Sequence, residues 1–98
     1  MVSNKDMKNL LKAVDLLKAI SNPNRLAILC TLSDGELSVG ELVEKIGLSQ
    51  SALSQHLAKL RACGLVDTRR EQQTIYYSLK SSEAEAIIDV LHKLYCRR

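Results

Sequence analysis

The stretch LSQSALSQHLAKLRACGLV, from Leu48 to Val66, begins with small polar residues of the kind that read nucleic-acid bases. Within it, the candidate base-reading residues are Ser49, Gln50, Ser51, Ser54 and Gln55. Glutamine can form a bidentate contact with adenine, and serine can donate to or accept from several base edges. Short side chains also let a helix approach the major groove closely. The pattern predicts base recognition in double-stranded DNA, and the alternative is a surface helix that is merely rich in Ser and Gln.

Cationic and amide side chains continue this chemistry further along the chain. The candidate DNA contacts in this group are His56, Lys59, Arg69, Arg70, Gln72 and Gln73. Arginines and glutamines at a hairpin suit phosphates or a minor groove. The alternative for the two arginines is ordinary solvated charge, because Asp67 and Glu71 lie beside them. For His56 we expect packing or a backbone hydrogen bond, with a phosphate contact as the second possibility.

Composition limits the classes of function that fit this chain. Its 98 residues suffice for one domain, and a net charge of +3 makes it only mildly basic. With no Phe or Trp and three Tyr, the chain lacks the aromatic platform typical of single-strand binding. It has no Gly-rich phosphate loop, paired catalytic carboxylates or nucleophile elbow, so neither an enzyme nor a cofactor is expected. The polar N-terminus and the lack of a long apolar run predict a cytoplasmic protein without a membrane contact.

The elements that position these residues follow from periodicity and capping signals. Ser38 and Glu41 have capping-box spacing, and Ser49 can cap the next helix after the glycine turn at Gly47. Ser82 to Glu85 is interpreted as a second capping box. A change to β-branched and aromatic residues predicts a hairpin whose strands are joined by EQQ.

Together these signals predict one domain over residues 1–98, mainly α-helical with a β-hairpin wing, in the order ααααββα. Two short helices joined by a tight turn form a helix-turn-helix, and the hairpin after them makes it a winged version. The expected parts are helices over 6–20 and from Pro23, the helix-turn-helix over 38–62, the wing over 65–79 and a last helix over 82–96.

The first and last helices, over 6–20 and 82–96, carry broad apolar stripes. A chain this small would have difficulty in covering both stripes by itself. A homodimer would bury them and would place two recognition helices about 34 Å apart, as the two half-sites of a palindrome require.

Three segments resemble one known family. The segments LSVGEL, LSQSALSQHLAKLRACGLV and TRREQQTIYYSL look like the ArsR/SmtB family of winged-helix bacterial regulators, over nearly the whole chain. The resemblance implies a homodimeric, nucleoid-associated regulator of transcription that binds promoter DNA. LSQSALSQHL together with the C-terminal LHKLYC further resembles members that activate toxin genes. This implies a role in virulence in which DNA occupancy relieves silencing.

Many members of this family sense metals, through either of two kinds of site. The helix that begins near Ser38 reads VGELVEKI, without Cys or His, and the last helix offers only Asp89 and His92. No metal is therefore expected, although a metal-responsive repressor of the same family stays an alternative. A winged-helix module used only for protein association is the other alternative.

The three cysteines, Cys30, Cys63 and Cys96, are an odd and widely spaced set, which argues against a disulfide framework. Chemistry alone favours Cys30 as a small buried residue and Cys96 as a frayed terminal one, although Arg97 and Arg98 would favour a thiolate at Cys96. The family resemblance implies something more, because its thiol-sensing branch carries cysteines at the positions of Cys30 and Cys96. It implies redox or reactive-sulfur sensing by this pair. Cys63 has no such counterpart and is expected to pack at the helix end.

Overall fold

The computed structural model describes residues 2–96 as five helices and a three-stranded antiparallel sheet. The architecture is a winged helix-turn-helix, so the predicted fold class is confirmed. In chain order the elements are α1 (Asn4–Ile20), α2 (Pro23–Leu32), β1 (Leu37–Ser38), α3 (Val39–Ile46), α4 (Gln50–Ala62), β2 (Val66–Glu71), β3 (Thr74–Leu79) and α5 (Ser82–Tyr95).

The predicted order ααααββα omitted one strand. Residues Leu37 and Ser38 of β1 pair antiparallel with Tyr77 and Tyr76 of β3, so the sheet order is β1-β3-β2. Two residues are too few to carry an alternating pattern, and this strand exists because β3 offers it a free edge. The wing is therefore joined to the helical body by backbone pairing as well as by its chain ends.

Capping side chains set the ends of the helices. Ser38 Oγ accepts from the Glu41 amide at 3.2 Å and the Glu41 carboxylate accepts from the Ser38 amide at 2.9 Å, so the predicted capping box is present. The second predicted box was wrong by one residue. Ser81, not Ser82, caps α5, since its Oγ accepts from the Ala84 amide at 3.1 Å.

The turn between α3 and α4 depends on a glycine. Gly47 ends α3 with φ +82°, in the left-handed region that side-chain-bearing residues rarely adopt, and its amide donates to Val43 O. Leu48 follows directly, and Ser49 then caps α4 by accepting from the Ala52 amide at 3.1 Å. This short connection fixes α4 against α3.

The core lies where α2, α3, α4 and α5 meet. Its side chains are aliphatic throughout, as the scarcity of aromatic residues requires. The largest fully buried ones are Ile28, Leu29, Leu42, Leu53, Leu57, Leu60, Val66 and Ile88. The helix-turn-helix contributes four of these leucines, so α4 is held by the most densely buried part of the protein.

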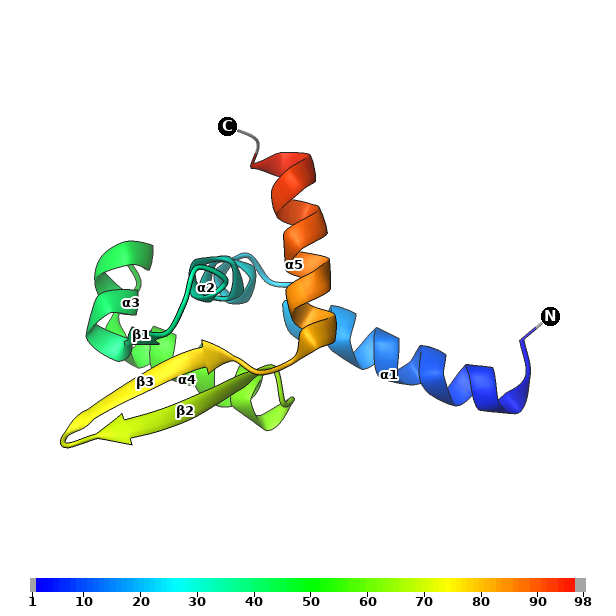
Figure 1. Cartoon of the computed structure of the whole chain (residues 1–98), viewed down its shortest axis with the longest axis horizontal. Helices are drawn as coiled ribbons and strands as arrows, with labels where there is room; N and C mark the ends of the chain where they lie inside the picture. Colours follow the sequence, from blue (N-terminus) through cyan, green and yellow to red (C-terminus); the bar gives the residue numbers. More distant parts are fainter. Residues whose placement is uncertain (1, 97–98) are drawn as a thin grey trace.

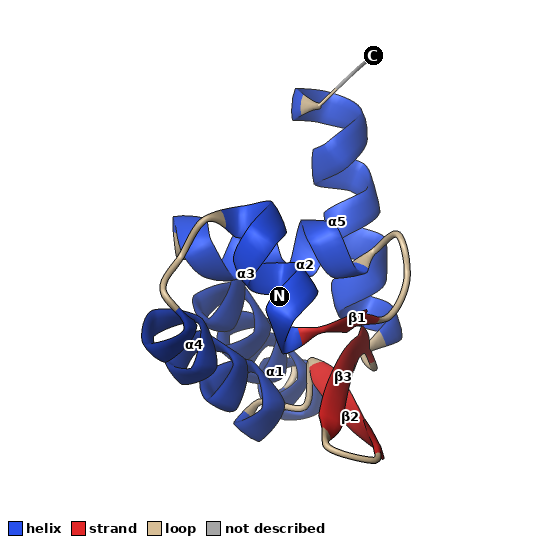
Figure 2. Cartoon of the chain, turned by 90° about the vertical axis from the view of Figure 1, so that its left-hand side faces the viewer, coloured by secondary structure: helices blue, strands red, loops and turns tan. Residues whose placement is uncertain are grey.

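The arrangement of the elements leaves α1 outside the compact body. Figure 1 shows α1 projecting away from the other helices, with the wing extending in the opposite direction. The Cα radius of gyration is 14.5 Å, against about 13 Å for a compact domain of this length. In Figures 1 and 2, α4 and the β2–β3 hairpin occupy the same side of the molecule, while α5 rises from the other. Across residues 2–96 no helix has the length and apolar content to span a membrane.

Candidate nucleic-acid interface

The two faces of α4 differ sharply in burial. Leu53, Leu57 and Leu60 are 0% exposed. The polar residues on the other face, Gln50, Ser51, Ser54 and Gln55, are all exposed. Because the leucines anchor the helix, its polar face can meet a ligand without disturbing the packing that holds the fold. The structure therefore brings these four predicted reading residues together on one accessible surface.

Two further predicted residues of α4 occupy different positions on the same element. Ser49 is exposed, but its hydroxyl already serves as the helix cap. His56 is half-buried, beside the leucine face rather than on the open one. The Ser49 hydroxyl is therefore used as a cap rather than for a base contact, and Ser49 marks the end of α4 where free backbone amides can bind a phosphate. The first turn of α4 carries no acidic residue that would repel a phosphate.

The wing separates the two arginines that the sequence grouped together. Neighbouring residues of a strand point to opposite faces, so Arg69 and Arg70 leave β2 on different sides. Arg70 Nε donates to the carbonyl oxygen of Gln72 at 3.1 Å, at the tip of the hairpin. Gln72 and Gln73 are exposed there, and Gln72 has φ +57°, which the tight turn imposes. The tip therefore presents one arginine and two amides.

Arg69 is engaged within the protein instead. Its guanidinium forms ion pairs with Glu36 Oε1 at 2.8 Å and with Glu71 Oε2 at 2.7 Å. The hydrogen bond from Arg69 holds the pKa of the Glu36 carboxyl below its ordinary value, and the two carboxylates raise the pKa of Arg69. Glu36 was not singled out in the sequence, because it lies 33 residues from Arg69 and no local pattern links them.

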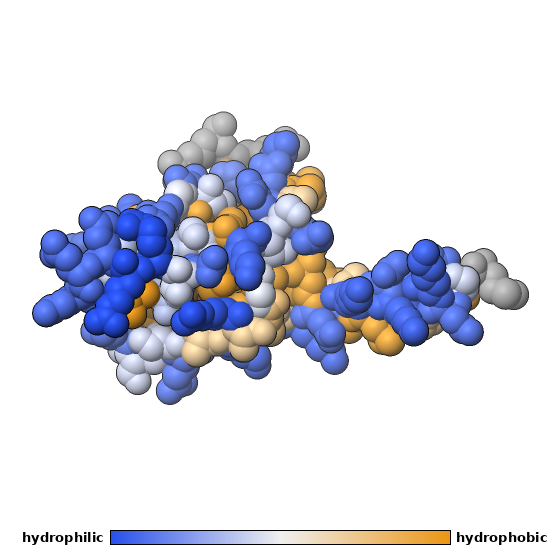
Figure 3. Space-filling view, turned by 60° about the horizontal axis from the view of Figure 1, so that its bottom comes forward, coloured by the Kyte–Doolittle hydropathy of each residue, from blue (hydrophilic) through white to orange (hydrophobic). Residues whose placement is uncertain are grey.

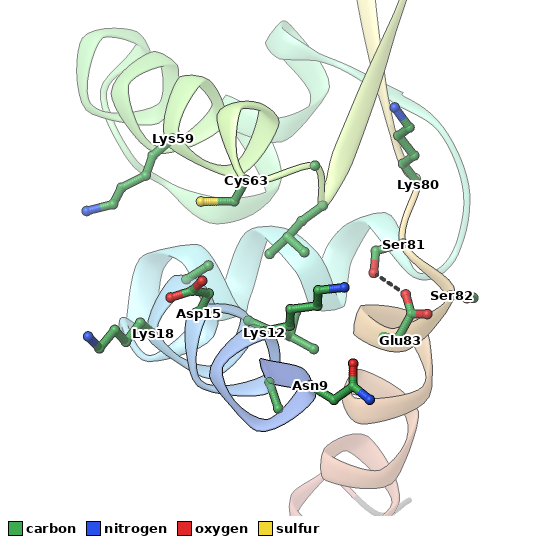
Figure 4. Close-up of a pocket in the computed structure, with 15 residues that line it drawn as sticks. Asn9, Lys12, Asp15, Lys18, Lys59, Cys63, Lys80, Ser81, Ser82 and Glu83 are labelled. Carbon is green, nitrogen blue, oxygen red and sulfur yellow. Dashed lines mark hydrogen bonds between the residues drawn. The ribbon is translucent and has the colours of Figure 1, made fainter. Parts of the chain in front are cut away.

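Lys59 and Cys63, from the end of α4, face a groove of about 1070 Å³ (Figure 4). The opposite wall comes from α1 and the start of α5, including Lys12, Asp15 and Glu83. The expectation that Cys63 packs at the helix end was wrong, because Cys63 is exposed. The helix ends at Ala62, and the space beyond its last turn is this groove rather than core.

Apolar surface gathers on the two terminal helices. Figure 3 shows it running from the middle of the molecule along the projecting α1, whereas the end that carries the wing is hydrophilic. The exposed large apolar side chains of these helices are Met7, Leu10, Leu11, Val14 and Leu17 on α1, and Val90, Leu94 and Tyr95 on α5. Contiguous patches of this kind mark interaction surfaces in soluble proteins.

Cys30 and Cys96 are both free thiols in this structure. Cys30 is half-buried on α2, and Cys96 is exposed at the C-cap of α5. Burial raises the pKa of the Cys30 thiol, and the charge of the neighbouring Cys96 raises it further. Cys96 is the more accessible of the two thiols. Arg97 and Arg98, which the sequence placed beside it, lie outside the described residues.

The candidate metal ligands of α5 do not converge with others. Asp89 forms an ion pair with Lys93 at 3.1 Å, and His92 is exposed. Both line a hollow of about 450 Å³ against the end of α2, together with Asp34 and Glu85. Within residues 2–96, no group of three or more His, Cys, Asp or Glu side chains is placed to hold a metal ion.

Comparison with known proteins decides the family. Residues 22–68, from the cap of α2 into β2, match the arsR family of bacterial regulatory proteins. The transcriptional activator HlyU of Vibrio cholerae is 62% identical over 90 residues, which cover 92% of this chain and 83% of that protein. This chain belongs to the ArsR family. It is therefore a DNA-binding regulator of transcription.

The similarity to other ArsR-family members extends to the whole fold. The solved structure of reduced HlyU from Vibrio cholerae superposes with a TM-score of 0.93 at 59% identity, covering 97% of this chain and 100% of that one. The nodulation protein NolR of Rhizobium meliloti is 54% identical over 83 residues, 85% of this chain and 68% of that protein. The biofilm growth-associated repressor of Xylella fastidiosa is 44% identical over 85 residues, 87% of this chain and 75% of that protein. ArsR-family relatives thus include both an activator and a repressor.

Proposed function

We propose that this ArsR-family protein binds operator DNA as a homodimer, with α4 in the major groove and the wing against the backbone. The observation that carries the proposal is the division of α4 into a fully buried leucine face and an exposed face of Gln50, Ser51, Ser54 and Gln55. The hairpin lies on the same side of the molecule, so both elements can meet one duplex (Figure 2). Lys59 and the tip residues Arg70, Gln72 and Gln73 extend the surface that would follow the phosphates.

A second copy of the chain is the proposed occupant of the apolar faces of α1 and α5. A helix that projects from the body with leucines 47% to 57% exposed is costly in water unless another surface covers it. An isologous dimer through both helices would cover the two faces together. It would also set two α4 helices about one turn of DNA apart, or about 34 Å.

The regulatory role proposed is activation of toxin genes by relief of silencing. HlyU of Vibrio cholerae is a transcriptional activator, which supports activation rather than repression. Relief of silencing asks of the protein only that it occupy the promoter and exclude another DNA-binding protein. The exposed polar face of α4 suits that task, because DNA occupancy needs no additional surface for polymerase.

For Cys30 and Cys96 we propose thiol-based sensing. Oxidation of the two thiols by a peroxide or polysulfide would remove two protons and two electrons and join α2 to the end of α5. Because burial raises the pKa of Cys30, the exposed Cys96 would react first. A solved structure of a relative is that of reduced HlyU from Vibrio cholerae. The bond would tie the helix behind α4 to the proposed dimer helix.

Mobility shift of operator duplexes selected from genomic DNA tests DNA recognition. Ser54→Ala should weaken operator binding several-fold, because it removes a hydroxyl from the reading face of α4. Ser82→Ala removes a serine hydroxyl from α5, away from that face, and should bind like the wild type. Equal binding by both variants would show that this face of α4 does not read bases.

The same assay after oxidation tests the thiols. Reduced protein should bind and oxidised protein should bind more weakly, whereas Cys30→Ser and Cys96→Ser should each abolish the response. Cys63→Ser is the matched control, since Cys63 is also an exposed thiol. The sensing proposal fails if mass spectrometry finds no Cys30–Cys96 linkage, which requires Cα atoms within about 7 Å.

A further inference from the structure

Three nitrogens of the Arg69 guanidinium are occupied by carboxylates of this chain. Nε donates to Glu36 Oε2 at 3.1 Å and Nη2 to Glu36 Oε1 at 2.8 Å, which is a bidentate arrangement. Nη1 donates to Glu71 Oε2 at 2.7 Å. The guanidinium also lies over the ring of Tyr76, at 4.7 Å from its centroid. Charge-assisted bidentate pairs and cation–π contacts both favour one fixed geometry.

The partners of Arg69 belong to different parts of the fold. Glu71 is on the same strand as Arg69, and Tyr76 is directly opposite it on β3. Glu36 comes from outside the hairpin, in the loop that leads from α2 into β1. The Arg69 side chain therefore crosses the central strand of the sheet and bonds to the helical body. Of these contacts, only the pair with Glu36 connects the wing to another region.

The wing needs such a connection because its outer half is exposed. Along β2 and β3 only Val66 is fully buried, Tyr77 and Leu79 pack partly against the core, and residues 69–75 toward the tip are exposed. A two-stranded hairpin is at best marginally stable without packing beneath it. The two residue pairs between β1 and β3 hold the middle strand, β3, whereas β2 lies at the other edge of the sheet and pairs only with β3. Arg69 is thus placed to hold the outer strand at a fixed angle.

We propose that Arg69 and Glu36 form a latch that positions the wing, and that Arg70 provides the arginine contact to phosphate. To reach a phosphate, Arg69 would have to give up a bidentate carboxylate and a second ion pair, which would offset the gain. Arg70 leaves the opposite face of β2 and forms no ion pair among residues 2–96. Arg69 is therefore a positioning residue in the proposed DNA-binding function, on which this inference rests.

Neutralising each carboxylate in turn distinguishes a latch from a phosphate contact. With Arg69 as a latch, Glu36→Gln releases the wing and weakens operator binding by about 3- to 10-fold, equivalent to about 0.7–1.4 kcal/mol. Glu71→Gln is the matched control, because it removes the other carboxylate partner but leaves the tie to the body. It should change affinity by less than about 2-fold. If Arg69 instead contacts phosphate, both variants free it and remove a negative charge, so both should bind DNA more tightly.

The salt dependence of DNA binding provides a second measurement, because it reports the number of phosphates neutralised and does not change when only the position of the wing changes. Arg70→Gln should lower the slope of log K against log salt by about 0.9 for each phosphate that the protein no longer neutralises. Arg69→Gln should lower affinity with the wild-type slope. A slope that falls equally in both variants overturns the inference. Thermal denaturation checks that each variant is folded.

Amide hydrogen exchange of β2 and β3, measured without DNA, tests the latch independently of the proposed DNA binding. Glu36→Gln should accelerate exchange in residues 66–79, and Glu71→Gln should not. If no operator is bound by the wild type but this difference is seen, the proposed function fails and the latch stands. If operator binding is normal and exchange is the same in both variants, the latch fails alone.

Discussion

The recognition helix α4 and the wing hold their positions by different means. Three fully buried leucines fix α4, and its exposed Gln50, Ser51, Ser54 and Gln55 form no side-chain hydrogen bond within residues 2–96. The wing is fully buried only at Val66, and one of its two arginines, Arg69, is held in ion pairs with carboxylates of the protein itself. An element that is anchored by buried side chains can leave its whole polar face free to bind a ligand. An element with few buried side chains, such as the wing, uses some of its charged side chains in ion pairs that fix its position. The positive charge of a wing residue is therefore not sufficient evidence that it contacts DNA.

The largest expected effect concerns the anchoring of α4. Leu57→Ala should lower the free energy of unfolding by about 2–5 kcal/mol, because it removes a fully buried side chain and leaves a cavity. Ile75→Ala in the wing, where the side chain is 41% exposed, should cost far less. Urea denaturation of both variants measures the difference. Equal losses would mean that the wing is packed as firmly as α4.

A smaller effect should distinguish the cap of α5 from its neighbour. Ser81→Ala should lower the free energy of unfolding by about 1 kcal/mol, because the Ala84 amide loses its acceptor. Ser82→Ala removes an exposed hydroxyl in the first turn and should stay within about 0.5 kcal/mol of the wild type. If thermal or urea denaturation showed a larger loss of stability for Ser82→Ala than for Ser81→Ala, the capping box predicted from the sequence, Ser82 to Glu85, would be correct instead.

The smallest effect is the pH dependence of the wing. The pKa of Glu36 is lowered by Arg69 in the folded protein, so this pair stabilises the wing above the ordinary carboxyl pKa. The contribution is lost as pH falls through the lowered pKa. Exchange rates in residues 66–79, corrected for intrinsic pH effects, should therefore rise on acidification in the wild type. They should not rise in Glu36→Gln, and a rise of equal size in that variant would assign the effect to another group.

The features that the sequence predicted are those with local signals. The helix-turn-helix follows from the Ser38 and Ser49 caps, the turn at Gly47 and the leucine spacing of α4, all within one stretch of chain. The hairpin follows from its β-branched and aromatic residues. These signals also place the four exposed polar residues of α4 on one face, because helical periodicity alone decides it.

The features that the sequence did not predict depend on contacts between distant residues. Strand β1 exists only as a partner of β3, and the half-exposed side chain of Arg69 is held in an ion pair by Glu36, 33 residues earlier. Cys63 follows the buried leucines at helical spacing, yet it is exposed and lines the groove between α4 and α1. In each case the residue type was compatible with both outcomes, and tertiary packing chose between them.

Binding of the Gln50→Ala, Gln55→Ala double variant tests the central claim, that α4 reads bases and the wing does not, most directly. Affinity would be measured by fluorescence anisotropy for the selected operator and for a scrambled duplex of the same length and composition, at several salt concentrations. Removing each bidentate pairing should reduce discrimination by about 1–3 kcal/mol. The double variant should bind both duplexes nearly alike and keep the wild-type salt slope. Retention of the wild-type preference for the operator would contradict base reading by α4.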